Sequence, residues 1–198
     1  MARLLLIRHG ESTWNEDGRW QGHADPPLSA LGERQALAAG RALGAMAAVW
    51  SSDLVRARRT AELIVTPDRA ADVTVDPRLR ERDVGEWTGL TRAQIEAEWP
   101  GYLAAYRSPP GFEPNDALLA RVLAAIHDAA ERAPAGDTLI VTHAGVIRTL
   151  ERDLGAKGEP LANLAGRWIT ADGDKLQLGA RALLLDPHDV TVTVPRSL

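Results

Sequence analysis

The residues with the clearest chemical potential lie close to the N-terminus, where an apolar run gives way to polar side chains. The aliphatic residues 4–7 are followed directly by Arg8, His9 and Gly10. A histidine can act as a base, a metal ligand or a nucleophile, and a neighbouring arginine offers a fixed fork of donors for phosphate or carboxylate oxygens. Gly10 allows a sharp turn and a close approach to a ligand. The triplet predicts an anion site with a reactive imidazole, and its alternative is a structural strand end.

Two further segments end in the same way. Residues 137–142 form an apolar run that ends at His143, and residues 47–50 lead through a short polar segment to Arg56. The carboxyl ends of parallel strands lie at one edge of a sheet, and helix N-termini there offer free N–H groups to a phosphate. We therefore expect both histidines to share a pocket with Arg8 and Arg56. That pocket suits a phosphoryl group, whose charge the arginines neutralise while a neutral imidazole attacks phosphorus.

The hydrophobic pattern supplies the elements that must position these residues. Apolar runs without alternation predict buried strands at 4–7, 47–50, 73–75 and 137–142. Antiparallel strands are expected at 167–170 and 176–185, with a turn at Asp172-Gly173. Helices are predicted from Ser29 to Leu43, from Asp53 onward, from Thr91 to before Pro100, and over 146–154. A further long helix is predicted to begin at Asn115 or Asp116, with Leu119, Val122, Leu123 and Ile126 facing inward. Strands that alternate with helices predict the α/β class, as a three-layer α/β/α sandwich with a mostly parallel central sheet.

Length and composition narrow the classes of protein. At 198 residues and 21.4 kDa, the chain is expected to form one domain over residues 1–198. A net charge of −4 argues against nucleic-acid or anionic-membrane partners. The absence of cysteine excludes disulfides and thiolate chemistry. No apolar stretch has the length of a signal-peptide core or a membrane span, so a cytoplasmic location is expected.

A family resemblance begins at the same triplet. The run Arg8-His9-Gly10-Glu11-Ser12-Thr13-Trp14-Asn15 resembles the signature of the histidine phosphatase superfamily, in its phosphoglycerate mutase-like branch. Further similar segments follow in the family's order up to about residue 150, and each motif supports the others. They are Gln21-Gly22, Pro27-Leu28-Ser29, residues 51–57 with Thr60-Ala61, Leu79-Arg80-Glu81, Gly85-Glu86-Trp87, Gly89-Leu90 and residues 141–148.

The resemblance implies a role for each matching residue. His9 would be the nucleophile that becomes a phosphohistidine, and Glu81 would protonate the leaving oxygen and then activate water. The resemblance assigns the nonbridging phosphoryl oxygens to Arg8, Arg56 and His143, helped by Asn15. Ser12, Gln21, Gly22 and Ala144 are further candidate substrate contacts, and no metal or other cofactor is implied.

Within this family the sequence favours a phosphatase over a mutase. A mutase needs additional cationic groups for a second phosphate, and mutases of the family carry them in an insertion. Here residues 90–133 are short, and the arginines in that segment (Arg92, Arg107, Arg121, Arg132) are scattered along it. The expected activity is hydrolysis of a small phosphorylated metabolite. A cofactor-dependent phosphoglycerate mutase and a non-catalytic binding protein on the same fold are the alternatives.

Several residues admit two interpretations at this stage. For His23, Trp20, Trp87 and Phe112, contact with the substrate and a purely structural role both fit the sequence. A metal site built from His9, His23 and Asp25 is disfavoured, because arginine beside a cation is electrostatically unhelpful. The expected partner is a small phosphate ester, and the chain is expected to be a monomer or a homodimer.

Overall fold

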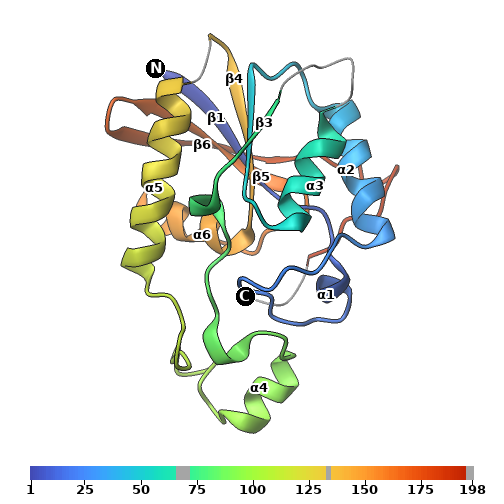
Figure 1. The fold of residues 1–198 in the computed structure, drawn as a ribbon, viewed down its shortest axis with the longest axis vertical. Coiled ribbons are helices and arrows are strands. Elements are labelled where there is room, and N and C mark those ends of the chain that lie inside the picture. The colour runs from blue at the N-terminus through green and yellow to red at the C-terminus, as the bar shows by residue number, and fades with distance from the viewer. Residues whose placement is uncertain (66–71, 133–134, 195–198) are drawn as a thin grey trace.

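The computed structural model describes residues 1–65, 72–132 and 135–194, and a six-stranded sheet lies at its centre (Figure 1). The strands are β1 (Ala2–Arg8), β2 (Ala48–Ser51), β3 (Val73–Val75), β4 (Asp137–Thr142), β5 (Ala165–Asp172) and β6 (Lys175–Leu183). Their order in the sheet is β3-β2-β4-β1-β5-β6. The first four in this order pair in parallel, while β5 is antiparallel to both β1 and β6. The sheet is therefore mostly parallel, as expected.

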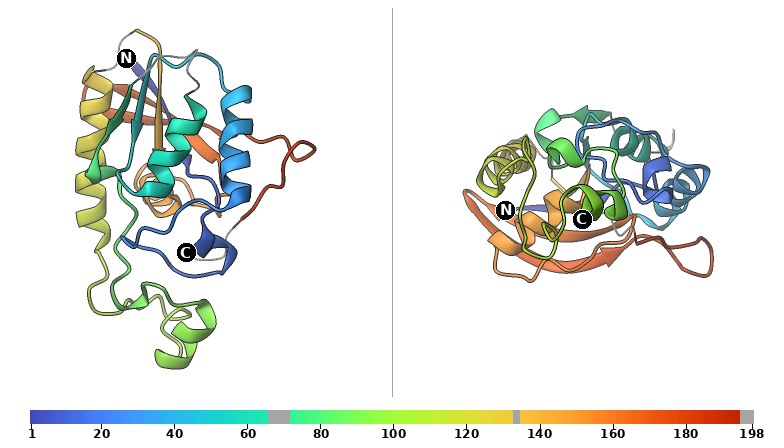
Figure 2. Two further views of the ribbon diagram at one scale, coloured as in Figure 1. Left: turned by 45° about the vertical axis from the view of Figure 1, so that its right-hand side comes forward. Right: turned by 90° about the horizontal axis from the view of Figure 1, so that it is seen from below.

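Helices cover both faces of the sheet. The helices α2 (Ala30–Ala42) and α3 (Val55–Ile64) lie on one face, and α5 (Asn115–Arg132) and α6 (Ala144–Asp153) lie on the other (Figures 1 and 2). Strand β1 shows why: Leu4 and Leu6 pack into the core with α5 and α6, whereas Leu5 and Ile7 pack with α2 and α3. An unbroken aliphatic run is what a strand buried on both faces requires. The predicted three-layer architecture is confirmed.

A smaller group of elements extends past the sheet. This group consists of the helix α4 (Arg92–Glu98) and the short helices α1 (Thr13–Glu16), η1 (Pro77–Leu79) and η2 (Gly85–Trp87). Only α4, which begins after a capping box at Thr91, was predicted from the sequence. Figure 1 shows α4 beyond the carboxyl ends of the parallel strands. A separate apolar cluster of Trp20, Val84, Trp87 and Ile95 holds this region together. This part of the chain thus packs next to the carboxyl ends of the parallel strands.

Several element boundaries differ from the predicted ones. Helix α3 begins at Val55 rather than at Asp53, because the Asp53 carboxylate instead accepts a hydrogen bond from Nε of Arg80 at 2.8 Å. Helix α6 begins at Ala144 rather than at residue 146, and His143 is its N-cap residue. Strand β6 ends at Leu183 rather than at residue 185.

The buried face of α5 also differs from the predicted one. Its fully buried residues are Leu118, Val122, Ala125, Ile126 and Ala129, whereas Leu119 and Leu123 are only partly buried. The two small alanines let the helix approach the sheet closely, so the larger leucines move to the border of the contact. Among the described residues, no helix has the length and apolar character needed to cross a membrane.

Candidate active site

Three neighbouring strands bring the predicted residues together at one edge of the sheet. In the parallel pair of β1 and β4, Arg8 lies opposite Thr142, and the backbone N–H of His9 donates to the Thr142 carbonyl at 3.0 Å. The chain reaches His143 one residue later, and the two imidazole rings meet edge to face with centroids 5.1 Å apart. Strand β2 pairs with the other side of β4 and leads into α3, which carries Arg56. The two histidines and the two arginines therefore lie close together at this edge of the sheet.

His9 is held in a defined tautomer. Its Nδ1 lies 2.6 Å from the carbonyl oxygen of Gly10. Because a carbonyl oxygen only accepts, Nδ1 carries the proton and Nε2 keeps its lone pair. Burial, together with the nearby charges of Arg56 and Arg8, holds the pKa of His9 well below its usual 6.5. The ring is therefore neutral near pH 7 and is able to act as a nucleophile through Nε2.

The arginines Arg8 and Arg56 are almost completely buried beside this ring. Arg8 donates from Nη1 to the Leu161 carbonyl at 2.7 Å, and Arg56 donates to the carbonyls of Ala24 and Gly22 at 2.7 and 2.9 Å. Burial lowers the pKa of each guanidinium to about 10, so both stay charged at neutral pH. The Nε of each has no hydrogen-bond partner among the described residues. Each guanidinium is fixed in place yet keeps a donor for an oxyanion.

His143 is fully buried next to His9. Neither of its ring nitrogens has a hydrogen-bond partner within the described part of the chain. Burial and the charge of Arg56 hold its pKa well below the usual 6.5. A neutral imidazole with free nitrogen atoms is able to donate one hydrogen bond to a phosphoryl oxygen.

Glu81 is fixed by backbone N–H groups. Its Oε1 accepts from the N–H of Arg82 at 2.8 Å, and its Oε2 accepts from the N–H of Gly145 at 3.1 Å. The backbone carbonyl of Glu81 accepts from Nε2 of His23 at 2.8 Å and from Arg121 at 2.9 Å. His23 thus contacts Glu81 through the backbone, which fits the structural interpretation of this residue.

A small cavity lies between these groups. All of the predicted site residues except His143 and Ser12 line it: Arg8, His9, Asn15, Gln21, Gly22, Arg56, Glu81 and Ala144. Ser12 caps α1 instead, since its Oγ accepts from the Asn15 N–H at 3.1 Å and donates to Gln21 Oε1 at 2.9 Å. The Asn15 Nδ2 is buried without a partner among the described residues, so it keeps a donor for the cavity.

Two supporting residues received no role from the sequence. Asn163 donates from Nδ2 to the His9 carbonyl at 2.9 Å. Thr60 accepts from the Gly10 N–H at 3.0 Å and donates to the Arg56 carbonyl at 2.7 Å. Thr60 stands in a segment that resembles the family, which is a usable signal. Asn163 lies beyond the last similar segment, and nothing in the sequence indicates that it reaches His9.

The residues of the alternative metal site do not converge. Asp25 caps α3 by accepting from the Val55 N–H at 2.6 Å, and Nε2 of His23 points to the Glu81 carbonyl. Within residues 1–65, 72–132 and 135–194, no group of three or more His, Cys, Asp or Glu side chains is arranged to hold a metal ion.

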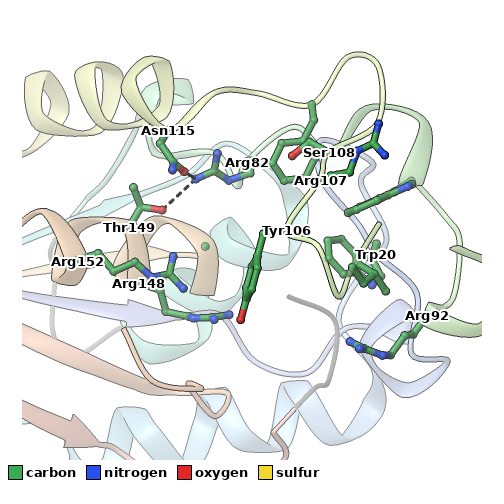
Figure 3. Close-up of a pocket in the computed structure, with 14 residues that line it drawn as sticks. Trp20, Arg82, Arg92, Tyr106, Arg107, Ser108, Asn115, Arg148, Thr149 and Arg152 are labelled. Atoms are coloured by element: carbon green, nitrogen blue, oxygen red, sulfur yellow. Dashed lines mark hydrogen bonds between the residues drawn. The ribbon is translucent and has the colours of Figure 1, made fainter. Parts of the chain in front are cut away.

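A larger pocket lies on the Glu81 side of this cavity (Figure 3). Trp20, Trp87 and Phe112, the three aromatic residues whose role the sequence left open, line this pocket. The arginines considered scattered are partly brought together. Arg92 and Arg107 line this pocket, together with Arg82, Arg148 and Arg152, whereas Arg121 and Arg132 do not. Two of the four arginines that are scattered along the sequence thus lie in one pocket.

Comparison with known proteins agrees with this geometry. Residues 4–169 match the model of the histidine phosphatase superfamily, branch 1. A metal-independent phosphoserine phosphatase of Arabidopsis thaliana is 33% identical over 196 residues, which cover 94% of this chain and 80% of the relative. Phosphoglycerate mutase-like protein 4 of Arabidopsis thaliana is 32% identical over 188 residues, covering 88% of this chain and 82% of the relative.

Solved structures support the same assignment. A mycobacterial glucosyl-3-phosphoglycerate phosphatase, solved in complex with VO3, is 31% identical with a TM-score of 0.82, and the match covers 90% of this chain and 98% of that one. The chain belongs to the histidine phosphatase superfamily, branch 1. The family resemblance, the fold and the phosphomonoesterase class expected from the sequence are confirmed.

Gly145 provides a test of how Glu81 is held. A Cβ atom at this position would clash with Glu81 Oε1, so Gly145→Ala must displace the carboxylate. We expect turnover to fall by about 100-fold, since small misplacements of a reacting group have effects of this order. Steady-state kinetics measures it, with circular dichroism to confirm folding. Gly44→Ala is the matched control, because a Cβ there meets nothing within 4 Å. Normal turnover of Gly145→Ala would show that the position of Glu81 does not matter.

Proposed function

We propose that this protein hydrolyses a small phosphorylated metabolite through a phosphohistidine formed on His9. The observation that carries the proposal is the state of the His9 imidazole. Its Nδ1 is bonded to the Gly10 carbonyl, its Nε2 is free, and its low pKa keeps it neutral next to Arg8 and Arg56. The relatives named as phosphatases support the same reaction.

In the first step, the phosphoryl group occupies the small cavity. Arg8, Arg56 and Asn15 donate to its nonbridging oxygens, and His143 donates from one ring nitrogen. His9 Nε2 attacks phosphorus as the bond to the leaving oxygen breaks, and protonated Glu81 gives its proton to that oxygen. The Nδ1–H of His9 stays bonded to the Gly10 carbonyl, which stabilises the positive charge that the ring acquires.

In the second step, water replaces the departed alcohol. The Glu81 carboxylate takes a proton from the water as its oxygen attacks phosphorus, and the bond between phosphorus and Nε2 breaks. Inorganic phosphate leaves, His9 returns to its neutral form and Glu81 is protonated again. Two easier displacements thus replace one difficult displacement.

The reaction is proposed to need no metal, because two buried guanidinium groups supply the charge stabilisation that a metal would give. We expect hydrolysis of para-nitrophenyl phosphate in the presence of a chelator. The rate should be highest at mildly acidic to neutral pH, since the low pKa of His9 keeps its lone pair free below pH 6.5. Phosphate release across a pH series measures this. Loss of activity with chelator, and its recovery with a divalent ion, would contradict the prediction.

One observation supports the alternative that the protein is a phosphoglycerate mutase. The five arginines of the larger pocket would also suit the second phosphate of a bisphosphorylated intermediate. Hydrolysis remains the preferred function, because the pocket is open to water around the exposed side chain of Tyr106 and a mutase must exclude water. An assay with phosphoglycerate as substrate and bisphosphoglycerate as primer distinguishes the two activities. A mutase gives isomerised phosphoglycerate, whereas a phosphatase gives inorganic phosphate. A non-catalytic binding protein would give neither.

The proposal also covers the domain organisation, the state of assembly, the location and the partners of the protein. The protein is proposed to be a single-domain monomer or homodimer in the cytoplasm, with no nucleic-acid or membrane partner. The net charge of −4 and the absence of cysteine support this assignment. Size-exclusion chromatography with light scattering measures the state of assembly.

A further inference from the structure

The larger pocket begins where the leaving group would depart. Gly145 lines this pocket, and its N–H donates to Glu81 Oε2 at 3.1 Å. Arg82, the residue after Glu81, lines it as well (Figure 3). A group protonated by Glu81 therefore faces this pocket rather than bulk solvent.

Positive charge gathers in this pocket from separate parts of the chain. Arg82 follows Glu81, Arg92 opens α4, Arg107 precedes α5, and Arg148 and Arg152 lie one turn apart on α6. No aspartate or glutamate is among the described residues that line it. A pocket with five guanidinium groups and no carboxylate has a strongly positive potential.

The side chain of Arg82 donates hydrogen bonds to uncharged acceptors. Its guanidinium donates to the carbonyl of Glu113 at 2.6 Å, to Asn115 Oδ1 at 2.6 Å and to Thr149 Oγ1 at 3.1 Å, all of which are uncharged acceptors. The Arg107 guanidinium lies over the Tyr102 ring, 4.3 Å from its centroid. These contacts orient the two cations and leave their charge available.

Some of the arginines also repel one another. Burial and then the charge of Arg152 lower the pKa of Arg148, with Glu81 and Glu151 acting in the opposite direction. Burial lowers the pKa of Arg82 as well, where Glu81 and Glu113 oppose the shift and Arg152 adds to it. Like charges held together disfavour their charged forms. An anion in the pocket would remove this repulsion, whereas a neutral ligand would not.

The aromatic side of the pocket offers further donors. The side chains of Trp20 and Trp87 are only 6% and 3% exposed, and neither indole N–H has an acceptor in the described part of the chain. Buried polar groups without partners are rare in proteins, so each indole points to an acceptor that a ligand would bring. Tyr106, placed between Arg148 and Trp20 in Figure 3, is 96% exposed and has a left-handed backbone with φ of 53°. Such a backbone is unusual for a residue with a side chain.

From these observations we propose that the larger pocket selects phosphomonoesters whose leaving group carries a second anionic group, a carboxylate or a phosphate. The proposal rests on the phosphatase function above and specifies its substrate class. The guanidinium groups bind the second anion, and the indoles and Tyr106 contact the carbon skeleton between the two charges. A neutral alcohol as leaving group would occupy the pocket without forming an ion pair with its guanidinium groups.

Matched substrates test this selection. The values of kcat/KM are compared for para-carboxyphenyl phosphate against phenyl phosphate, for phosphoglycerate against glycerol phosphate, and for a propanediol bisphosphate against propyl phosphate. We expect about a tenfold or larger preference for the acidic member of at least one pair, decreasing as salt is raised. The first two pairs report on a carboxylate and the third on a phosphate. Hydrolysis of all neutral members with ratios near one would overturn the selection and leave the phosphatase function intact. Release of phosphate from no substrate would overturn both.

Charge-removing variants test which residues carry the selection. Arg107→Gln and Arg152→Gln change side chains that are exposed, so both are expected to fold. Each should lower the acidic-to-neutral ratio by about tenfold, mainly through a higher KM for the acidic substrate. Arg34→Gln, an exposed arginine on α2 outside the pocket, is the matched control and should keep the ratio. Wild-type ratios in both pocket variants would overturn the proposal.

Discussion

Rapid quenching of the working enzyme in alkali is expected to trap a phosphoryl group on His9, and acid is expected to release it. The proposal that this imidazole is the nucleophile rests on its neutral ring, its free Nε2 and the neighbouring charges of Arg8 and Arg56. His143 is not among the residues that line the cavity, and its proposed role is to donate one hydrogen bond to a phosphoryl oxygen from beside the His9 ring. Peptide mapping of labelled protein locates the phosphate.

Variants of the two histidines separate their roles. His9→Ala should lose the adduct and essentially all turnover, because no other group in the cavity is placed to attack phosphorus. His143→Ala should be slower, yet still form the adduct on His9. A label on His143, or normal turnover of His9→Ala, would overturn the mechanism.

Arg8→Ala and Arg56→Ala are each expected to slow turnover by about two orders of magnitude or more. Each change removes a buried, charged donor aimed at the phosphoryl oxygens, and loss of one such donor has effects of this size. Steady-state kinetics measures the loss, with thermal unfolding followed by circular dichroism to show that both variants fold.

Conservative and neighbouring variants complete this test. Arg56→Lys keeps the charge but loses the planar fork that donates to the Gly22 and Ala24 carbonyls, so it should recover only part of the activity. Arg58→Ala changes an exposed arginine two residues along α3 and should leave turnover near that of the wild type. Near-normal turnover of either alanine variant at Arg8 or Arg56 would show that the arginine does not contact the transferring group.

Predictions that rest on local sequence were largely correct. The aliphatic run before Arg8, the apolar run before His143 and the capping pattern at Thr91 are each contained within a few residues, and each formed the predicted element. Parallel strands bring their carboxyl ends to one edge, so the meeting of His9 and His143 followed from the strand assignments alone. Helix limits were less accurate, as at Asp53, because a long-range ion pair with Arg80 competed with capping.

The sequence by itself determined the family, the layers of the fold and most of the residues that line the small cavity, because each depends on contiguous motifs and on hydrophobic periodicity. The tertiary structure decided the tautomer of His9, the capping role of Ser12 and the backbone contact of His23 with Glu81. It also brought Arg107 and Arg152 into one pocket, although 45 positions separate them in the chain. These features depend on the directions of side chains from distant segments, and only the packed chain fixes those directions.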